Sequence, residues 1–469
     1  MIQSRFFRNV SFNTFQLIIN QLFGLLIFYG LSKGLDKNIF GQINWSLAVL
    51  LTVFGILTLG IDQVMVKKIA AGYNRQSIFS IYLFHVIISG GVFYIVLLLF
   101  YFLLPYDLFL VTSLLFIGLG KLGVFISSPF KQLASGLEKF RELFLMSVTS
   151  NVIRGFLIFI LLLVHKLSVS NVFIIFVLGD LSELALCIFI ARPLLESSFK
   201  LRFNKRRHFS LIKESLPQTG VVLFTAIMSR FDWILIGVLV SSIKLAEYSF
   251  AYKIFEVSTL PLLIIAPIMI PLFTRLHKSS ENMNNISFFL EWQMIIASFI
   301  ALLLNICWIP LVDFISDGKY GIVNSGTIFL LSLSMPLLYF TNYLWTINFT
   351  KGNLKLIFIV MAASFAVNIT SCCILIPIYK NEGAAMAYLF TIITQLIFYI
   401  WKKTLIVPKT RGYFLLWPVT TILIALVVYF FTSHTIVRIS IATILYLTTV
   451  LISKQASLKN WKNLHSLYQ

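Results

Sequence analysis

Eight charged residues lie inside runs of sequence that are otherwise apolar, and their types predict a ligand site. Four are bases, Lys121, Arg154, Arg230 and Lys253, and four are acids, Asp180, Glu183, Asp232 and Glu256. A guanidinium group suits phosphate because its planar fork donates two parallel hydrogen bonds to the oxygens. A carboxylate in a water-poor site can take up a proton or a cation. The bases therefore predict an anionic substrate, with the acids as counter-ions or as coupling groups for H⁺ or Na⁺.

A structural interpretation of the same residues stays open. A charge at the centre of a bilayer costs at least ~2.5 kcal/mol, so such residues face water-filled cavities or pair with one another. The four bases and four acids balance, so all of them could form ion pairs between helices. The substrate interpretation fits Arg154 and Arg230 best, because a mid-membrane arginine is a costly way to join helices. The structural interpretation fits Asp180 and Glu183 best.

Spacing along a helix decides which of these side chains can meet. Arg230 and Asp232, in the run MSRFDWILIG, point about 200° apart around a helix and do not pair with each other. Lys253 and Glu256 are three residues apart and can share a face. We expect Arg230 to meet the substrate and Asp232 to hold a neighbouring base, with Lys253 as the nearest candidate.

Uncharged polar residues in the same apolar runs are candidates for contacts with sugars. Asn20, Gln21 and Asn151 could donate to sugar hydroxyls, or could equally hydrogen-bond between helices. Tyr248 is expected at the membrane interface as an aromatic anchor. The six histidines and four cysteines show no metal-ligand spacing. We predict no metal and no organic cofactor.

Membrane helices must position these residues. The chain of 469 residues is 59% hydrophobic and 12% charged, whereas a soluble domain carries about 25% charge. Apolar runs of about 20 residues, each able to cross the hydrocarbon layer as a helix, recur along the chain. We predict an all-α polytopic membrane protein with about fourteen spans, at 12–31, 43–61, 78–104, 108–127, 143–164, 171–191, 215–240, 248–274, 289–309, 324–347, 354–377, 384–401, 413–431 and 436–453.

The distribution of basic residues predicts the orientation. With both termini in the cytoplasm, the inner segments hold 26 of the 37 lysines and arginines and the outer loops hold seven. Cytoplasmic loops are enriched in these residues, so this bias supports the count of spans. The net charge of +20 then reflects topology and attraction to anionic inner-leaflet lipid, and no nucleic-acid partner is predicted.

Two segments that resemble each other predict an internal repeat. ASGLEKFRELFLMSVTSNVIRG (134–155) and TKGNLKLIFIVMAASFAVNIT (350–370) both place a basic turn before a long span. The repeat predicts a six-helix bundle at 1–191, a basic cytoplasmic linker at 192–214, and a second six-helix bundle at 215–403. Residues 404–469 would add two helices and a basic cytoplasmic tail.

Three stretches resemble polysaccharide flippases of the Wzx (O-antigen) type, in the MOP exporter superfamily. They are residues 9–50, residues 230–276, and IPIYKNEGAAMAYLFTIITQ (376–395). The resemblance implies two six-helix lobes around a central cavity in the bacterial inner membrane. It also implies transfer of polyprenyl-pyrophosphate-linked oligosaccharide to the outer leaflet for cell-surface polysaccharide synthesis, with a polysaccharide polymerase as a partner.

Two other functions are weighed against this one. An ion-coupled multidrug antiporter of the same superfamily would share the lobes, but it needs acids to attract cationic drugs. The four embedded bases argue against it, and the four accompanying acids keep it as an alternative. A membrane polysaccharide polymerase or glycosyltransferase needs a sizeable loop with catalytic carboxylates or histidines. The predicted outer loops are too short for that, so we predict that the chain is not an enzyme.

Overall fold

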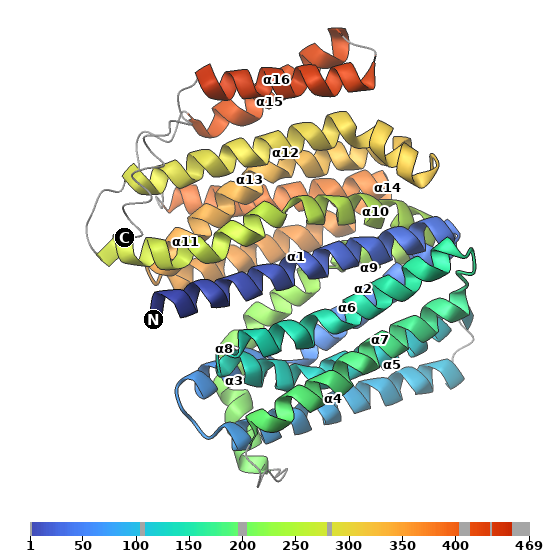
Figure 1. The fold of residues 1–469 in the computed structure, drawn as a ribbon, viewed down its shortest axis with the longest axis vertical. Coiled ribbons are helices and arrows are strands. Elements are labelled where there is room, and N and C mark those ends of the chain that lie inside the picture. Colours follow the sequence, from blue (N-terminus) through green and yellow to red (C-terminus); the bar gives the residue numbers. More distant parts are fainter. Residues whose placement is uncertain are drawn as a thin grey trace. The chain divides into compact units, whose positions relative to one another are not determined.

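The structure is a computed structural model that describes residues 2–103, 108–195, 204–278, 284–402, 413–431 and 434–452 (Figure 1). All regular secondary structure in these ranges is helical, which confirms the all-α prediction. The predicted cytoplasmic tail, the segment 403–412 and residues 196–203 of the predicted linker lie outside the described residues. The chain divides into two compact units, Met1–Ser249 and Phe250–Gln469.

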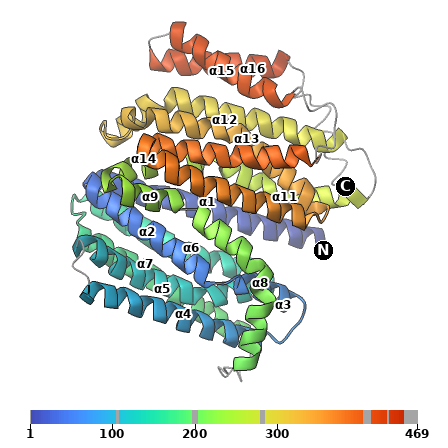
Figure 2. The same cartoon turned by 180° about the vertical axis from the view of Figure 1, so that it is seen from behind.

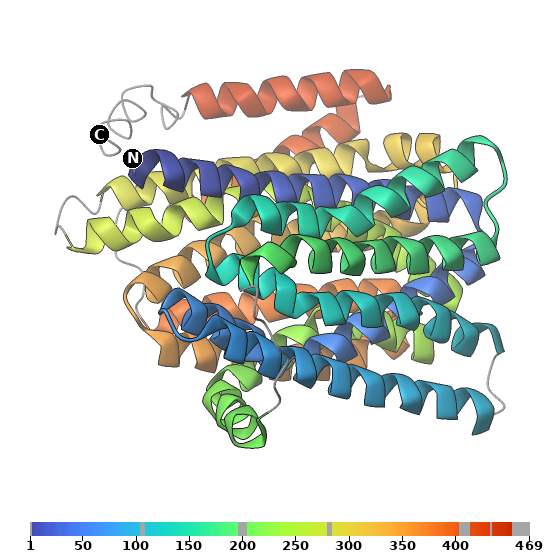
Figure 3. The same ribbon diagram turned by 60° about the horizontal axis from the view of Figure 1, so that its bottom comes forward.

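Unit 1 consists of long helices that pack in sequence-distant pairs. It contains α1 (Ile2–Gly34), α2 (Lys37–Leu57), α3 (Ile61–Ala70), α4 (Arg75–Leu103), α5 (Leu108–Gly136), α6 (Phe140–Leu163), α7 (Val169–Ala191), α8 (Lys205–Met228), α9 (Phe231–Leu239) and the start of α10 (Ser242–Ser258). Helix α5 packs on α7 and α4, and α6 packs on α1 and α7. From the blue α4 to the green α7 these helices run side by side in Figure 3.

Unit 2 contains the rest of α10 and six further helices. They are α11 (Leu260–Lys278), α12 (Asn284–Ser316), α13 (Ser325–Thr350), α14 (Leu354–Trp401), α15 (Tyr413–Phe431) and α16 (Thr435–Ile452). Helices α15 and α16 pack on α12 and on each other. Their buried aromatic residues Trp417 and Tyr446 join an apolar core that includes Met294 and Leu302 of α12.

The predicted number of spans is compatible with the helices. Ten described helices are long and apolar enough to cross a membrane, or up to 12 if each of two bent pairs is one span. The pairs α8–α9 and α10–α11 bend by 44° and 41°. The apolar part of α15, Leu416–Phe430, is shorter than the ten spans counted here. The chain is therefore a multi-pass membrane protein.

Helix α14 contains two of the predicted spans. A straight helix would place Asn368 and Thr391 about 35 Å apart, yet the Asn368 amide donates to the Thr391 hydroxyl at 3.1 Å. The chain reverses at Lys380, which has φ 52° and ψ −121°. The predicted spans 354–377 and 384–401 are thus the two arms of a tight helical hairpin.

Three features of unit 1 differ from the sequence-based expectation. The segment 62–77, expected as a loop, contains the short helix α3, and α8 begins at Lys205 within the predicted linker. Helix α8 runs across the direction of α4 and α5 (Figures 1 and 2). Residues 215–249, assigned by sequence to the second bundle, belong to unit 1. The bundle boundaries derived from the repeat stay a prediction.

Candidate functional site

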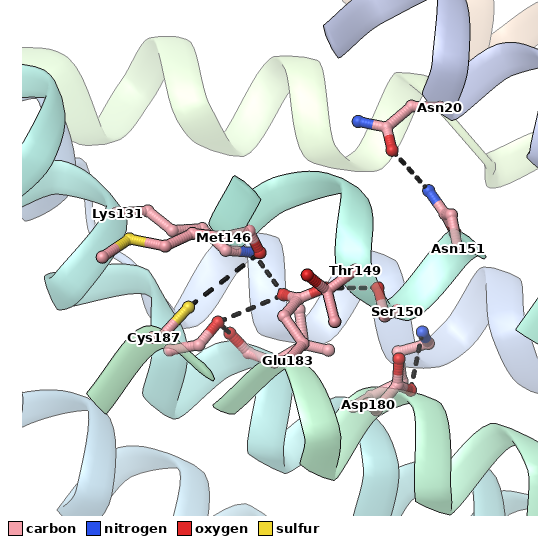
Figure 4. A network of polar contacts seen from close by, with 12 residues as sticks. Asn20, Lys131, Met146, Thr149, Ser150, Asn151, Asp180, Glu183 and Cys187 are labelled. Carbon is pink, nitrogen blue, oxygen red and sulfur yellow. Dashed lines mark hydrogen bonds and ion pairs between the residues drawn. The ribbon is translucent and has the colours of Figure 1, made fainter. Parts of the chain in front are cut away.

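The candidate site of unit 1 is a buried polar network centred on two acids of α7. Asp180 is fully buried and Glu183 is 2% exposed. They lie three residues apart, so they share the face of α7 that packs on α5 and α6. Figure 4 shows the side chains of these helices converging on the two carboxylates. The sequence-based expectation that both acids lie inside a span is met.

Asp180 contacts two bases from neighbouring helices. Its Oδ2 lies 2.9 Å from the Lys121 ammonium on α5, and its Oδ1 lies 3.4 Å from Nη1 of Arg154 on α6. These are ion-pair distances. Asp180 therefore joins α5, α6 and α7 through charge.

Glu183 is held by three donors. The Ser127 hydroxyl donates to its Oε1 at 3.3 Å, and the Lys131 ammonium contacts the same oxygen. The Ser150 hydroxyl donates to the other oxygen, Oε2. Sequence reasoning missed Lys131 because it placed this residue in a loop, whereas α5 continues through Pro129 to Gly136. The available signal was its spacing of four residues from Ser127, which puts both on one face of a helix.

Arg154, which the sequence predicts to contact substrate, instead contacts other residues of unit 1. Its Nε donates to the Ser150 carbonyl at 3.1 Å and its Nη2 donates to the Asn151 side-chain oxygen at 2.8 Å. The guanidinium carbon lies 5.1 Å from the centre of the Phe176 ring, and the residue is 7% exposed. With the Asp180 contact added, Arg154 links α6 to α7 in this conformation.

Two glycines make room for these ion pairs. A Cβ on Gly120 would lie 2.8 Å from the Asp180 Oδ2, and a Cβ on Gly179 would lie 2.5 Å from the Arg154 Cγ. Small residues allow membrane helices to approach closely. Here the missing side chains provide the space into which the carboxylate and the arginine stem fit.

The amides predicted to contact sugars lie at the edge of the network. The Asn151 amide donates to the Asn20 side-chain oxygen at 2.9 Å, which connects α6 to α1. The nitrogen of Asn20 points away from this contact (Figure 4). Asn20, Asn151 and the neighbouring Gln21 are each partly exposed. The structure thus brings Asn20 and Asn151 together beside Arg154.

Arg230 and Asp232 lie at a break between two helices. Helix α8 ends at Met228 and α9 begins at Phe231, so the run MSRFDW is a bend rather than the middle of one span. The Arg230 guanidinium lies over the Trp233 ring, 4.7 Å from its centre, and donates to the Ser229 carbonyl at 3.2 Å. Unlike Arg154, Arg230 is partly exposed.

Asp232 accepts hydrogen bonds from a tyrosine and from its own helix. The Tyr248 hydroxyl donates to Oδ2 at 2.7 Å, and the Trp233 backbone N–H donates to Oδ1 at 2.9 Å. The carboxylate also sits in the first turn of α9, where the helix dipole favours a negative charge. Tyr248 is fully buried, so the expectation of an interfacial anchor is wrong. Its hydroxyl is needed inside as the donor to Asp232.

Lys253 and Glu256 pair with each other in unit 2. The Lys253 ammonium lies 2.8 Å from the Glu256 Oε2 along α10, which confirms that they share a face. Their side chains are 16% and 27% exposed. Among the described residues, no group of three His, Cys, Asp or Glu side chains could hold a metal ion.

Comparison with known proteins adds a family and a fold. A family model described as "Polysaccharide biosynthesis protein" matches residues 6–277, which is more than half of the chain. No curated protein matches the sequence.

Several solved structures share the fold over most of their length. The chain is similar to a lipid II flippase MurJ in an inward closed conformation, with 15% identity, a TM-score of 0.77, and coverage of 95% of this chain and 99% of that chain. It is also similar to a multidrug resistance MATE family transporter of the MOP superfamily, facing inward, with 12% identity, a TM-score of 0.61, and coverage of 82% and 94%. A third is a MOP superfamily transporter from Pyrococcus furiosus, with 11% identity, a TM-score of 0.57, and coverage of 85% and 94%. At these identities the likeness concerns the fold.

Proposed function

The chain belongs to the polysaccharide biosynthesis protein family, and we propose that it is a flippase for polyprenyl-pyrophosphate-linked oligosaccharide. Family and fold confirm the resemblance to MOP-superfamily flippases noted in the sequence. The family and the similar structures consist of transporters and flippases, which agrees with the prediction that the chain is not an enzyme. We further propose that transfer runs from the cytoplasmic to the outer leaflet of a bacterial inner membrane, with both termini of the chain in the cytoplasm. The oligosaccharide would then be delivered to a polymerase that builds a surface polysaccharide such as O-antigen.

The observation that carries the proposal is a partly exposed arginine, Arg230, at the bend between α8 and α9. A lipid-linked oligosaccharide carries its fixed negative charge on the pyrophosphate. A positive charge in a low-dielectric region attracts such a group strongly.

Arg230 is the residue that we assign to the pyrophosphate. It is partly exposed at the bend between α8 and α9, and its planar fork matches two phosphate oxygens. Asp232 is held by Tyr248 and Trp233, so it supports the bend. In unit 2, Lys253 is proposed as a separate candidate contact, for whose ammonium the substrate would compete with Glu256.

We assign Arg154 and Lys121 a positioning role. Both are buried against Asp180, so binding substrate directly would require α6 and α7 to separate. In the conformation described here they fix the helices that carry Asn151. Asn20, Gln21 and Asn151 are partly exposed and are proposed to hydrogen-bond sugar hydroxyls.

Coupling to a proton or sodium gradient would use a carboxylate that can exchange its ion during the transport cycle. Asp232 and Glu256 are partly exposed, whereas Asp180 and Glu183 are buried. We therefore propose Asp232 and Glu256 as the coupling candidates. Transport by Asp232→Asn and Glu256→Gln, measured with and without each gradient, tests this. If transport by one variant no longer depends on the gradient, the substituted carboxylate is the coupling group. If transport by both variants still depends on the gradient, neither Asp232 nor Glu256 is the coupling group.

A multidrug antiporter is the second function that the shared fold permits, since a MATE transporter has it. Cationic drugs need carboxylates that are not already neutralised. Asp180, Glu183 and Glu256 each contact a base, and Asp232 accepts two hydrogen bonds. At these four acids, the pairing favours an anionic substrate over a cationic one.

The experiment that tests the assignment of Arg230 is transport in sealed proteoliposomes. Wild type, Arg230→Gln and the control Arg141→Gln, which removes an exposed arginine, are inserted in equal amounts with a labelled polyprenyl-pyrophosphate oligosaccharide. Charge-assisted hydrogen bonds are worth ~1.5–3 kcal/mol, so Arg230→Gln should transport about tenfold more slowly and Arg141→Gln normally. Equal rates for all three would remove Arg230 from the site.

A further inference from the structure

A pocket of about 320 Å³ lies in unit 1, far along α8 from the bend at Arg230. Its walls come from the end of α3, the first turns of α4 and the first turns of α8. Helix α8 presents Arg207, Ser210, Leu211 and Glu214 to it. Their spacing of three, four and seven residues places all four side chains on one face of the helix. This face of the first turns of α8 forms one wall of the pocket.

The polar groups of the pocket are suited to a phosphate. The Arg207 side chain is exposed and uses one N–H of its fork to bind the Ser77 hydroxyl at 2.8 Å. The Lys68 ammonium lies 2.6 Å from Glu214 and 5.4 Å from the centre of the Tyr73 ring. An arginine fork beside a serine hydroxyl and a lysine offers several donors to phosphate oxygens.

The surroundings of the pocket are strongly basic. Residues 61–77 and 204–216 hold seven bases, Lys67, Lys68, Arg75, Lys205, Arg206, Arg207 and Lys213, against the acids Asp62 and Glu214. Each base near a membrane surface adds about 1 kcal/mol of attraction to anionic lipid. The distribution of charge predicts that this end of the spans faces the cytoplasmic leaflet.

Apolar groups adjoin the polar ones. Inside the pocket, Ile78 and Leu211 are buried. On another face of α8, Phe209 is 60% and Leu216 is 64% exposed, and their spacing of seven residues places them on one side of the helix. An exposed apolar stripe flanked by lysine and arginine is typical of a helix that lies in the membrane interface. A free phosphate ion would use only the polar part of this arrangement.

We propose that this pocket binds the phosphate headgroup of an anionic phospholipid of the cytoplasmic leaflet, with Arg207 and Ser77 on the phosphate and Phe209 in the interface. A lipid bound there joins α3 and α4 to the start of α8. It would thereby hold the helix that leads to the bend at Arg230. The proposal stands whether or not the chain carries an oligosaccharide.

The test uses the full chain in nanodiscs that contain phosphatidylcholine with a minor fraction of phosphatidylglycerol. The lipids retained after transfer to neutral detergent are counted by native mass spectrometry. We expect wild type to retain phosphatidylglycerol in preference to phosphatidylcholine, and Arg207→Gln to lose most of that preference, by roughly three- to tenfold. The control Arg141→Gln removes the same charge from an exposed site and should retain it.

Three outcomes would overturn the proposal. Wild type without a preference for phosphatidylglycerol shows that no such site exists. An equal loss in Arg207→Gln and Arg141→Gln shows general surface attraction. Displacement of the lipid by inorganic phosphate, together with an unchanged preference in Phe209→Ser, shows a plain phosphate site. Thermal unfolding of each variant, compared with wild type, separates lost binding from lost folding.

Discussion

Arg154 on α6 and Asp180 on α7 contact each other across a helix interface, with Nη1 and Oδ1 3.4 Å apart and both residues buried. The arginine that the sequence assigns to the substrate therefore already has a counter-charge inside its own unit. Lys121 shares the same carboxylate at 2.9 Å. One acid thus serves as the counter-charge shared by two bases, and the packing of α5, α6 and α7 depends on it.

The first prediction concerns removal of that acid. Asp180→Asn leaves the buried Lys121 and Arg154 without their counter-charge, and breaking a buried pair from one side costs ~3–5 kcal/mol in soluble proteins. We expect a clear fall in the unfolding temperature of the purified protein. The double variant Asp180→Asn with Lys121→Met removes one stranded charge and should recover part of the loss. An unfolding temperature unchanged from wild type would show that the ion pairs contribute nothing.

The second prediction concerns the space at Gly179. Gly179→Ala places a Cβ 2.5 Å from the Arg154 Cγ, so α6 and α7 must separate, at a cost of about 1–3 kcal/mol. Gly91→Ala on α4 is the matched control, because its Cβ meets nothing within 4 Å. That control should be neutral or stabilising by up to about 1 kcal/mol. Comparable unfolding temperatures for the two variants would contradict the close packing.

The third prediction separates the two arginines. Arg154→Gln should lower the unfolding temperature more than Arg230→Gln, because Arg154 is buried among four partners and Arg230 is partly exposed. Arg230→Gln should instead lower transport at near-normal stability. Both quantities are measured on the same preparations. The reverse pattern would make Arg154 the substrate contact and Arg230 the structural residue.

The fourth prediction is a pH dependence at Asp62, which lies in the first turn of α3, outside the membrane-spanning helices. Burial raises the pKa of this carboxyl above its ordinary value of 3.8, although backbone N–H groups donate to it and oppose the rise. The folded state therefore keeps the proton at pH values where the unfolded chain has lost it. The free energy of unfolding should fall as pH rises from 3.8 through the raised pKa.

Asp62→Asn tests this dependence. It should stabilise the protein at neutral pH and flatten the fall, as measured by unfolding temperature between roughly pH 4 and 7. Glu138→Gln, at an exposed position, should change neither. A variant with the wild-type pH profile would show that another group causes the fall.

The spans themselves could be predicted from sequence because the bilayer imposes their length and composition. Each predicted span coincides with a helix, an arm of α14 or one of the bent pairs. The bend at Ser229 and Arg230 could not be predicted, because Trp233 to Val240 continue the apolar run without a proline or glycine pair. Tertiary contacts decide it, among them the Trp45 indole donating to the Ile234 carbonyl at 3.2 Å.

The candidate site could be predicted in part. Sequence reasoning found the embedded acids and bases, and it correctly placed Lys253 and Glu256 on one face of a helix. It missed Lys131, because hydropathy ends the fourth span at 127 while α5 continues to Gly136. It also expected a base at Asp232, where the structure provides the Tyr248 hydroxyl. Composition identifies buried charges, but the choice of partner depends on which helices pack together.

The measurement that bears most directly on the proposed function is translocation of a labelled polyprenyl-pyrophosphate oligosaccharide across sealed vesicles that contain the wild-type chain. Protein-free vesicles and a cationic dye as alternative substrate are run in parallel. The partly exposed Arg230 at the bend between α8 and α9 predicts that the chain moves the lipid-linked oligosaccharide and not the dye. Movement of the dye alone would contradict the flippase function and identify a drug antiporter with this fold.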